Sequence, residues 1–363
     1  MNGTSAESPI RTAVVGYGLS GSVFHAPLIA ADSQYSLDVI ATSDAGRQAA
    51  AVQRYPGVTT VPDGDAVLAL AAGLDLVVLG TPPATHYRLA KAALEAGLDV
   101  VVDKPFVVRS AEGQELIELA ARLGRVLSVY QNRRWDNGFL TIRKLMDAGE
   151  LGDVTRFESA MERWSPSISK SWKAAATVDD GGGIFLDLGT HLLDMAVQLF
   201  GPAEVIHAEL HARRAQEKAD DDIFVVLRHA GRKGRPAVTS HLSMNVMCAQ
   251  PGPAFRVLGT TAGYTKHGID PQEAQLLAGA LPTDPGYGVE PQEAHGELGT
   301  LGDLRRVATE PGAYQEFYRI LGDKIHDGGA ASALPLPVDP AGPVEVLKLI
   351  EQARALAQMP TSG

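Results

Sequence analysis

The sequence predicts an α/β fold in which a doubly wound parallel sheet of the Rossmann type is followed by an antiparallel α+β domain. The chain has 363 residues, too many for one small core. Its first third alternates short apolar runs with Ala- and Leu-rich stretches, whereas beyond about residue 130 β-like runs follow one another with few helices between them. We therefore expect domains at 1–130 and 131–340, and a C-terminal helix within 341–363 whose packing partner the sequence does not decide.

The strands expected in the first third are mostly continuous apolar runs, as in parallel strands that helices cover on both faces. Helix-like segments such as 84–96 lie between them, and Gly97 is expected to end that helix. The strands are predicted at 11–16, 37–42, 75–80, 98–102 and 126–130.

The second domain is predicted to begin with a helix at 136–149. The stretch 279–312 is rich in Gly and Pro and predicts long loops or an excursion of the chain, and a last helix is expected at 343–358. The β-like runs of this domain lie near 154–162, 203–212, 222–229, 236–243 and 254–259.

Composition and charge favour a soluble globular protein. The chain carries 32 basic and 43 acidic residues, a net charge of −11, which disfavours a general nucleic-acid or anionic-membrane role. Its single cysteine, Cys248, forms no intrachain disulfide, which suits a reducing compartment. The N-terminal residues show no secretory signal pattern, and no apolar run approaches the roughly 20 residues that span a bilayer. A cytoplasmic protein is expected.

A glycine motif, GYGLSG at 16–21, follows the first predicted strand and opens a helix. This context favours a dinucleotide-binding loop over an ordinary structural turn. Gly16 would allow the tight turn, Gly18 the approach of a pyrophosphate, and Gly21 close packing of helix on strand. The phosphates would then bind the free N–H groups at the helix start.

The residues after the second predicted strand bear on the choice of cofactor. An acid at this position binds the ribose hydroxyls of NAD, whereas Arg and hydroxyl groups hold the 2′-phosphate of NADP. Asp44 favours NAD, and Ser43 and Arg47 favour NADP. We expect NADP, with NAD as the alternative.

Lys104 belongs to the sequence DKPF, directly after a predicted strand. Ligands of open α/β sheets bind beyond the carboxyl ends of the strands, so Lys104 is placed to reach one. Its ammonium group would stabilise developing alkoxide charge on a substrate oxygen, although a solvated loop lysine fits the residue alone equally well.

Residues 181–194 read GGGIFLDLGTHLLD, an apolar helix that carries ionisable groups. Spacings of four and three place Asp187, His191 and Asp194 on one helical face. We interpret Asp187 and His191 as an active-site pair and Asp194 as structural. The glycines at 181–183 would allow close backbone approach to cofactor or substrate.

Five motifs together resemble the glucose–fructose oxidoreductase and inositol dehydrogenase family (Gfo/Idh/MocA). The sequence FHAPLI after the glycine motif, DKPF in place of the commoner EKP, and NRRWD resemble most the family's NADP-dependent scyllo-inositol 2-dehydrogenase branch. The resemblance runs from about residue 11 to about 270, and more faintly to the C-terminal helix. It is specific for the family, but much less so for the substrate. The motifs are GYGLSG, TPPATH (81–86), DKPF (103–106), QNRRWD (131–136) and GGGIFLDLGTHLLD.

The resemblance implies that the second domain contains a large, mostly antiparallel open sheet, often used for oligomerisation, so a homodimer or homotetramer is expected. It places catalytic roles on Lys104, Asp187 and His191, and substrate contacts on these three with Arg133 and Trp135. Lys173 departs from the Trp-Arg pair of many members, which weakens that assignment. The expected cofactor-binding residues are Gly16, Gly18, Leu19, Ser20, Gly21, Phe24, Ser43, Asp44, Arg47, Thr81, Pro82, His86, Asp103, Lys104, Asn132, Trp172 and Lys173.

The implied activity is NAD(P)-dependent interconversion of a secondary alcohol and a ketone on a cyclic polyol or sugar, with scyllo-inositol 2-dehydrogenase (NADP+) as the best match. In the oxidative direction His191 would take the hydroxyl proton, as imidazoles do near neutral pH, while hydride leaves the same carbon. Asp187 would orient the substrate and tune His191, and Lys104 would hold the oxygen.

Other functions fit the sequence less well. A reductase of nucleotide-linked keto-sugars would need a second phosphate motif, and a non-catalytic nucleotide sensor would not need Lys104, Asp187 and His191 together. A metal site is disfavoured because no third ligand accompanies the Asp187/His191 pair. No nucleophile motif of a serine hydrolase follows a strand. His25 and Arg134 could equally be structural or functional.

Overall fold

The computed structural model describes residues 8–167, 177–215, 218–231, 234 and 236–357. The chain forms two compact units. The predicted second domain, 131–340, contributes to both of them, because the chain returns to the first unit after Pro271 and again after Gly312. The first unit comprises 1–132, 272–287 and 313–344, and the second comprises 133–271, 288–312 and 345–363.

The first unit is built on a six-stranded sheet in the order β3-β2-β1-β4-β5-β6. All of its strand pairs are parallel, which confirms the doubly wound fold. The short edge strand β3 was not predicted. The strands are β1 (Ile10–Val15), β2 (Tyr35–Ala41), β3 (Thr59–Val61), β4 (Leu76–Leu79), β5 (Asp99–Asp103) and β6 (Leu127–Tyr130).

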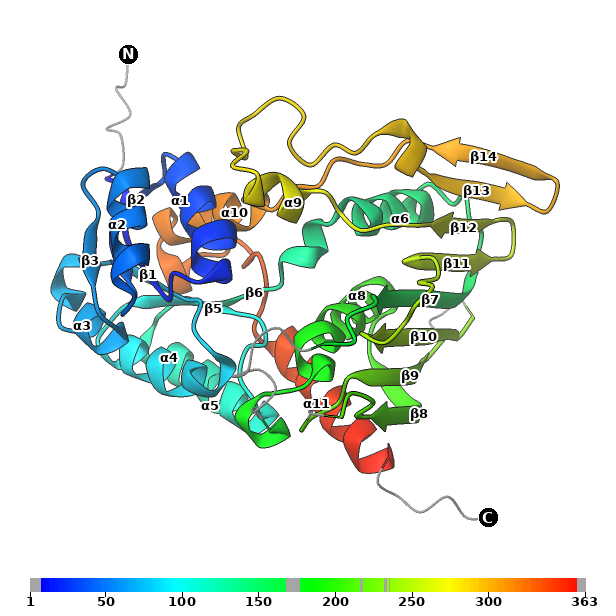
Figure 1. Cartoon of the computed structure of the whole chain (residues 1–363), viewed down its shortest axis with the longest axis horizontal. Coiled ribbons are helices and arrows are strands. Elements are labelled where there is room, and N and C mark those ends of the chain that lie inside the picture. The colour runs from blue at the N-terminus through cyan, green and yellow to red at the C-terminus, as the bar shows by residue number, and fades with distance from the viewer. Residues whose placement is uncertain (1–7, 168–176, 216–217, 232–233, 235, 358–363) are drawn as a thin grey trace. The chain divides into compact units, whose positions relative to one another are not determined.

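Helices cover both faces of this sheet, which explains its continuous apolar strands. In Figure 1, α1, α2 and α10 lie on one side of it and α4 and α5 on the other. Gly97, with φ +84°, follows the end of α4 as predicted. The helix α10, which was not predicted, comes from the segment 313–344. The α-helices of this unit are α1 (Ala26–Ala31), α2 (Ala45–Arg54), α3 (Gly64–Leu68), α4 (His86–Glu95), α5 (Ser110–Leu123), α9 (Gln272–Leu277) and α10 (Gln315–His326).

The second unit contains an eight-stranded sheet in the order β14-β13-β12-β11-β7-β10-β9-β8. Only β7 and β10 pair in parallel, which confirms the mostly antiparallel sheet. The strands are β7 (Val154–Glu162), β8 (Ala203–His211), β9 (Asp222–His229), β10 (Val238–Asn245), β11 (Phe255–Gly259), β12 (Gly263–Lys266), β13 (Gly296–Thr300) and β14 (Asp303–Val307).

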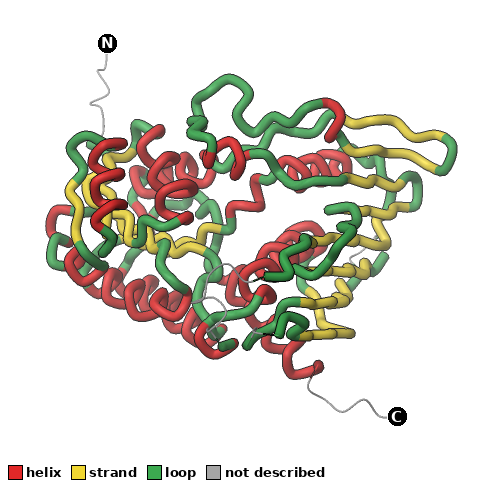
Figure 2. Tube along the Cα trace, viewed as in Figure 1, coloured by secondary structure: helices red, strands yellow, loops and turns green. Residues whose placement is uncertain are grey.

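The prediction of long loops over 279–312 is wrong in its second half, because β13 and β14 form a hairpin there. The turn Leu301-Gly302, with Gly302 at φ +88°, connects them. The sequences of both strands, GELGT and DLRRV, are short and lack a continuous apolar run, so strand periodicity is weak. Between α9 and the 3-10 turn η7 (Gln292–Ala294) the chain does run as loop (Figure 2).

Helices α6 (Asn137–Asp147), α8 (Thr190–Phe200) and α11 (Ala341–Ala357) complete the fold. Helix α8 packs on β7 and β10 (Figure 1), where Phe157 and Leu242 are fully buried. The opposite face of these strands carries half-buried polar groups such as Glu158 and His241. Within the described ranges, no helix is long and apolar enough to cross a membrane.

Candidate functional site

The glycine loop follows β1 and has the geometry that its spacing predicts. Gly16 has φ +93°, and a Cβ there would lie 2.6 Å from the carbonyl oxygen of Gly80. A Cβ on Gly21 would lie 1.9 Å from the oxygen of Gly16, so neither position accepts a side chain. A Cβ on Gly18 would meet only the Arg47 guanidinium, 4.0 Å away. Gly16 and Gly21 are therefore required by the loop itself, whereas Gly18 keeps a space open.

The helix after this loop begins as a π-helical segment, η1 (Ser20–His25), before it continues as α1. Such segments are rare in proteins, and those that occur are often found at functional sites. Leu19 is half-exposed at its start, and the ring of Phe24 packs against Tyr314, with centroids 6.2 Å apart. The amide groups at the start of a helix favour anions, so this end of the sheet suits a pyrophosphate.

The residues expected at the adenosine end lie at the start of α2. Asp44 is the N-cap of this helix, and its Oδ1 accepts a hydrogen bond from the Arg47 amide at 2.8 Å. Ser43, Asp44 and Arg47 are all exposed. Because the Arg47 side chain extends toward Gly18, its guanidinium lies beside the glycine loop.

His86 connects the loops after β4 and β5. Its Nε2 lies 2.8 Å from the oxygen of Thr81, and its Nδ1 lies 2.9 Å from the oxygen of Pro105. The imidazole is almost fully buried, and this burial lowers the pKa of His86. Thr81 also shares a hydrogen bond with the Thr85 hydroxyl, while Pro82 is exposed. His86 thus fixes the segment that carries Lys104.

Asp103 and Lys104 stand at the end of β5, as predicted. Asp103 Oδ1 accepts the Lys104 amide at 2.7 Å, and its Oδ2 accepts the Ser20 hydroxyl at 2.5 Å. Burial would raise the pKa of Asp103, but interactions with His25, Lys104 and Ser20 outweigh it and hold that pKa low. The bond from Lys104 to Pro105 is cis, and Lys104 is half-buried. An ionised Asp103 therefore joins the glycine loop to Lys104.

Asp187 and His191 lie in the second unit, but not on one regular α-helix. Asp187 belongs to the π-helical segment η6 (Phe185–Gly189), and His191 lies in the first turn of α8. The expected α-helical stacking of all three polar residues therefore holds only from His191 to Asp194. Asp187 is half-buried, whereas His191 is 4% exposed. No sequence pattern indicates the π-helical segment.

The start of this helix is held by Asp220. The Phe185 amide donates to Asp220 Oδ1 at 2.8 Å, and Arg354 of α11 donates to Oδ2 at 3.0 Å. Gly183 has φ +93°, and a Cβ there would lie 2.6 Å from Oδ1. The glycines at 181–183 were expected to allow approach of cofactor or substrate, but at Gly183 the group that approaches is the carboxylate of Asp220. Neither Asp220 nor Arg354 was predicted, since nothing in the sequence connects them to the helix.

Replacing Gly183 by Ala should destabilise the protein. The left-handed conformation costs a non-glycine residue roughly 1–2 kcal/mol, and displacing Asp220 from the helix start adds to this. Gly149→Ala is the matched control, because Gly149 has φ +71° with nothing near its Cβ position. Denaturant unfolding should show a larger loss for Gly183→Ala. Equal losses in the two variants would remove the role of Asp220.

Asp194 forms a buried, bidentate ion pair with Arg134. Arg134 Nε lies 2.8 Å from Oδ2 and Nη2 lies 2.7 Å from Oδ1, and the two side chains are 13% and 3% exposed. The pair joins the 3-10 turn η4 (Asn132–Trp135) to α8. This pairing is what a structural role for Asp194 predicts, and it gives Arg134 a structural contact.

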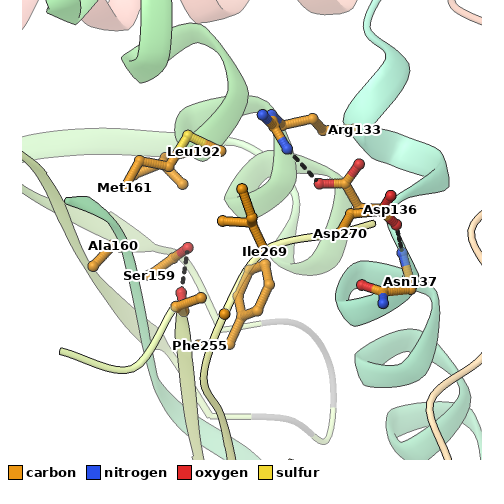
Figure 3. Close-up of a pocket in the computed structure, with 12 residues that line it drawn as sticks. Arg133, Asp136, Asn137, Ser159, Ala160, Met161, Leu192, Phe255, Ile269 and Asp270 are labelled. Carbon is orange, nitrogen blue, oxygen red and sulfur yellow. Dashed lines mark hydrogen bonds and ion pairs between the residues drawn. The ribbon is translucent and has the colours of Figure 1, made fainter. Parts of the chain in front are cut away.

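Arg133 lines a pocket in the second unit, together with Leu192, the neighbour of His191 in the chain (Figure 3). Its Nη1 lies 2.9 Å from Asp136 Oδ2, so the guanidinium charge is balanced. The pocket combines polar groups with apolar ones from β7 and β11. It is lined by Arg133, Asp136, Asn137, Ser159, Ala160, Met161, Leu192, Ala254, Phe255, Gly268, Ile269 and Asp270.

The remaining predicted residues lie on η4 or outside the described ranges. Asn132 is buried and Trp135 half-buried on η4. Trp172 and Lys173 lie outside the described residues. In the described ranges, no group of three or more His, Cys, Asp or Glu side chains is arranged to hold a metal ion.

Comparisons with known proteins match the whole architecture. Residues 10–131 match the model of an oxidoreductase family with an NAD-binding Rossmann fold, and residues 139–265 match the Gfo/Idh/MocA C-terminal domain. The uncharacterized oxidoreductase YdgJ of Escherichia coli is 37% identical over 94% of each chain. The scyllo-inositol 2-dehydrogenase (NADP(+)) IolW of Bacillus subtilis is 32% identical over 97% of this chain and 95% of its own. The crystal structure of an oxidoreductase from Bacillus cereus, 28% identical, aligns over 98% of both chains with a TM-score of 0.83.

Proposed function

Because the chain belongs to the Gfo/Idh/MocA family of NAD(P)-binding oxidoreductases, we propose that it oxidises a ring hydroxyl of a cyclic polyol with NADP+, as a scyllo-inositol 2-dehydrogenase. The observation that carries the cofactor half of this proposal is the glycine loop beside Lys104. The side-chain-free space at Gly18 and the Arg47 guanidinium next to it fit a phosphorylated dinucleotide.

The residues divide the chemistry as follows. The cofactor, when bound, would supply the hydride acceptor for this reaction. His191 takes the hydroxyl proton as a general base, and Asp187 orients the substrate. Lys104 donates to the same substrate oxygen and stabilises its developing negative charge. Asp103 fixes the main chain of Lys104 through the hydrogen bond to its amide.

The choice of an uncharged polyol rests on the relatives of this chain. Arg133, the predicted substrate residue, is paired with Asp136, so its guanidinium is not an unbalanced charge that would favour a sugar acid. The name of the relative IolW supports an inositol as the substrate. A screen of inositols, aldoses and sugar acids, with NAD+ and NADP+ in parallel, tests the proposal. We expect NADP+ reduction with scyllo-inositol. Activity with sugar acids only would contradict it.

Arg47 should determine whether the enzyme prefers NADP+ or NAD+. In the Arg47→Glu variant, the 2′-phosphate of NADP loses a cation and meets a carboxylate, so kcat/KM with NADP+ should fall by about 100-fold or more. The value with NAD+ should change much less. Arg54→Glu on the same helix α2 is the charge-matched control. Steady-state kinetics with NADP+ and NAD+ measure this difference. An equal loss of kcat/KM with both cofactors would exclude a role of Arg47 in binding the 2′-phosphate.

We also propose that the protein is a homodimer or homotetramer that associates through the eight-stranded sheet. The face of this sheet that carries Glu158 and His241 includes an aromatic contact, with ring centroids of Phe224 and His241 5.9 Å apart. Sedimentation equilibrium should give two or four chains, and Phe224→Glu should lower that number. A monomeric wild type would contradict the proposal.

A further inference from the structure

A buried polar chain ends at the carboxylate beside Lys104. The Nδ1 of His25 lies 2.7 Å from the hydroxyl of Tyr318 on α10. Both side chains are fully buried, among the rings of Tyr130, Tyr35 and Phe317. On its other side, the Nε2 of His25 faces Asp103 Oδ2 at 3.8 Å. All of these residues belong to the first unit.

The direction of the hydrogen bond between Tyr318 and His25 determines which ring nitrogen of His25 carries the proton. Burial raises the pKa of Tyr318 well above its usual value, so its hydroxyl keeps its proton. A protonated phenol can donate or accept, but an unprotonated Nε2 would turn its lone pair toward the ionised Asp103 carboxylate, so the hydroxyl is assigned as the donor to Nδ1. Nδ1 is then the acceptor, and the imidazole carries its own proton on Nε2.

The Nε2 proton therefore points to Asp103. At 3.8 Å the contact is longer than a hydrogen bond, and Nε2 has no hydrogen-bond partner among the described residues. A buried N–H without a partner costs roughly 1–3 kcal/mol. Phenylalanine and leucine at positions 318 and 25 would avoid that cost in a cluster this apolar. The polar pair thus has a use other than stability.

We propose that Tyr318 and His25 are positioning residues of the oxidoreductase reaction, which hold the Asp103 carboxylate so that it fixes both the glycine loop and Lys104. Asp103 bonds the Ser20 hydroxyl with Oδ2 and the Lys104 amide with Oδ1. The polarised Nε2–H attracts this carboxylate from the interior side. Without it, the carboxylate turns and Lys104 loses its position. This inference rests on the role proposed above for Lys104.

The Tyr318→Phe variant tests the proposal, with Tyr35→Phe as its matched control. Both changes remove one buried phenol hydroxyl from the same ring cluster, but the Tyr35 hydroxyl donates to the main-chain oxygen of Tyr318 instead. Tyr318→Phe should lower kcat by about 10- to 100-fold with little change in the Kd for NADPH, because catalytic geometry is sensitive to small displacements. Tyr35→Phe should keep kcat. Equal kcat values in the two variants would overturn the proposal.

Two changes at His25 give a second test. The amide nitrogen of Gln reaches the Nε2 position and that of Asn the Nδ1 position, so His25→Gln should retain more activity than His25→Asn. Selective histidine ¹⁵N labelling should find the His25 proton on Nε2 in the wild type and redistributed in Tyr318→Phe. An Nδ1 proton in the wild type would overturn the proposal. The role proposed for Lys104 is tested separately: Lys104→Ala should lose turnover, and wild-type turnover in that variant would remove the role of Lys104 without deciding how Tyr318 and His25 hold Asp103.

Discussion

Replacing His191 by Ala is expected to lower kcat by about 100- to 10,000-fold, the usual contribution of a general acid or base. The hydroxyl proton would have no acceptor on the enzyme at the moment when hydride leaves. The glycine loop and Arg47 lie in the other unit, so the Kd for NADPH should remain within about 2-fold of the wild-type value. Steady-state kinetics and fluorescence titration measure the two effects separately.

His295→Ala is the control for this experiment. His295 is a half-buried histidine of the same unit, directly after η7, and it has no part in the proposed chemistry. The His295→Ala variant should turn over at the wild-type rate. Added imidazole should restore part of the activity of His191→Ala but not raise that of His295→Ala. Wild-type turnover by His191→Ala would exclude His191 as the base.

Replacing Asp194 by Ala is expected to destabilise the protein by about 3–5 kcal/mol, the usual effect of breaking a buried ion pair from one side. The guanidinium of Arg134 would remain buried without a counter-charge. Because this pair joins η4 to α8, the position of His191 should become less defined and kcat should fall as well. Urea unfolding measures the loss of stability.

The pair between Arg11 and Asp75 provides the comparison. It has the same bidentate geometry, with distances of 2.9 and 2.7 Å, but its side chains are 45% and 38% exposed. Asp75→Ala should therefore cost no more than about 1 kcal/mol. If Asp194→Ala costs as little as Asp75→Ala, the Arg134–Asp194 pair does not stabilise the helix of His191.

The sequence predicts the fold best where periodicity is strong. The continuous apolar runs of β1, β2, β4, β5 and β6, and the β-like runs of β7 to β11, all lie at or near their predicted positions. The prediction fails for β13, whose sequence GELGT is interrupted by glycine, and for β14, whose residues are mostly charged and exposed. Their pairing depends on β12, a tertiary neighbour that no local pattern indicates.

The residues of the candidate site are likewise predictable only where the sequence carries a local signature. Motif spacing leads to Gly16, Gly21 and Lys104, because a backbone turn and a strand end have local signatures. The supporting groups have none: Tyr318 lies 293 residues from His25 in the chain, and Arg354 lies 134 residues from Asp220. The π-helical start of the His191 helix likewise depends on Asp220, which is distant in sequence. Polar contacts between residues that are distant in the chain therefore cannot be predicted from the sequence alone.

The central claim is that this chain transfers hydride from a ring carbon of a cyclic polyol to NADP+. The most direct test incubates the enzyme with scyllo-inositol deuterated at its ring carbons and follows the deuterium by mass spectrometry and NMR. We expect one deuterium on C4 of the nicotinamide of the NADPH formed, and at least 100-fold slower formation with His191→Ala. Tight NADPH binding without deuterium transfer from any inositol would contradict the claim.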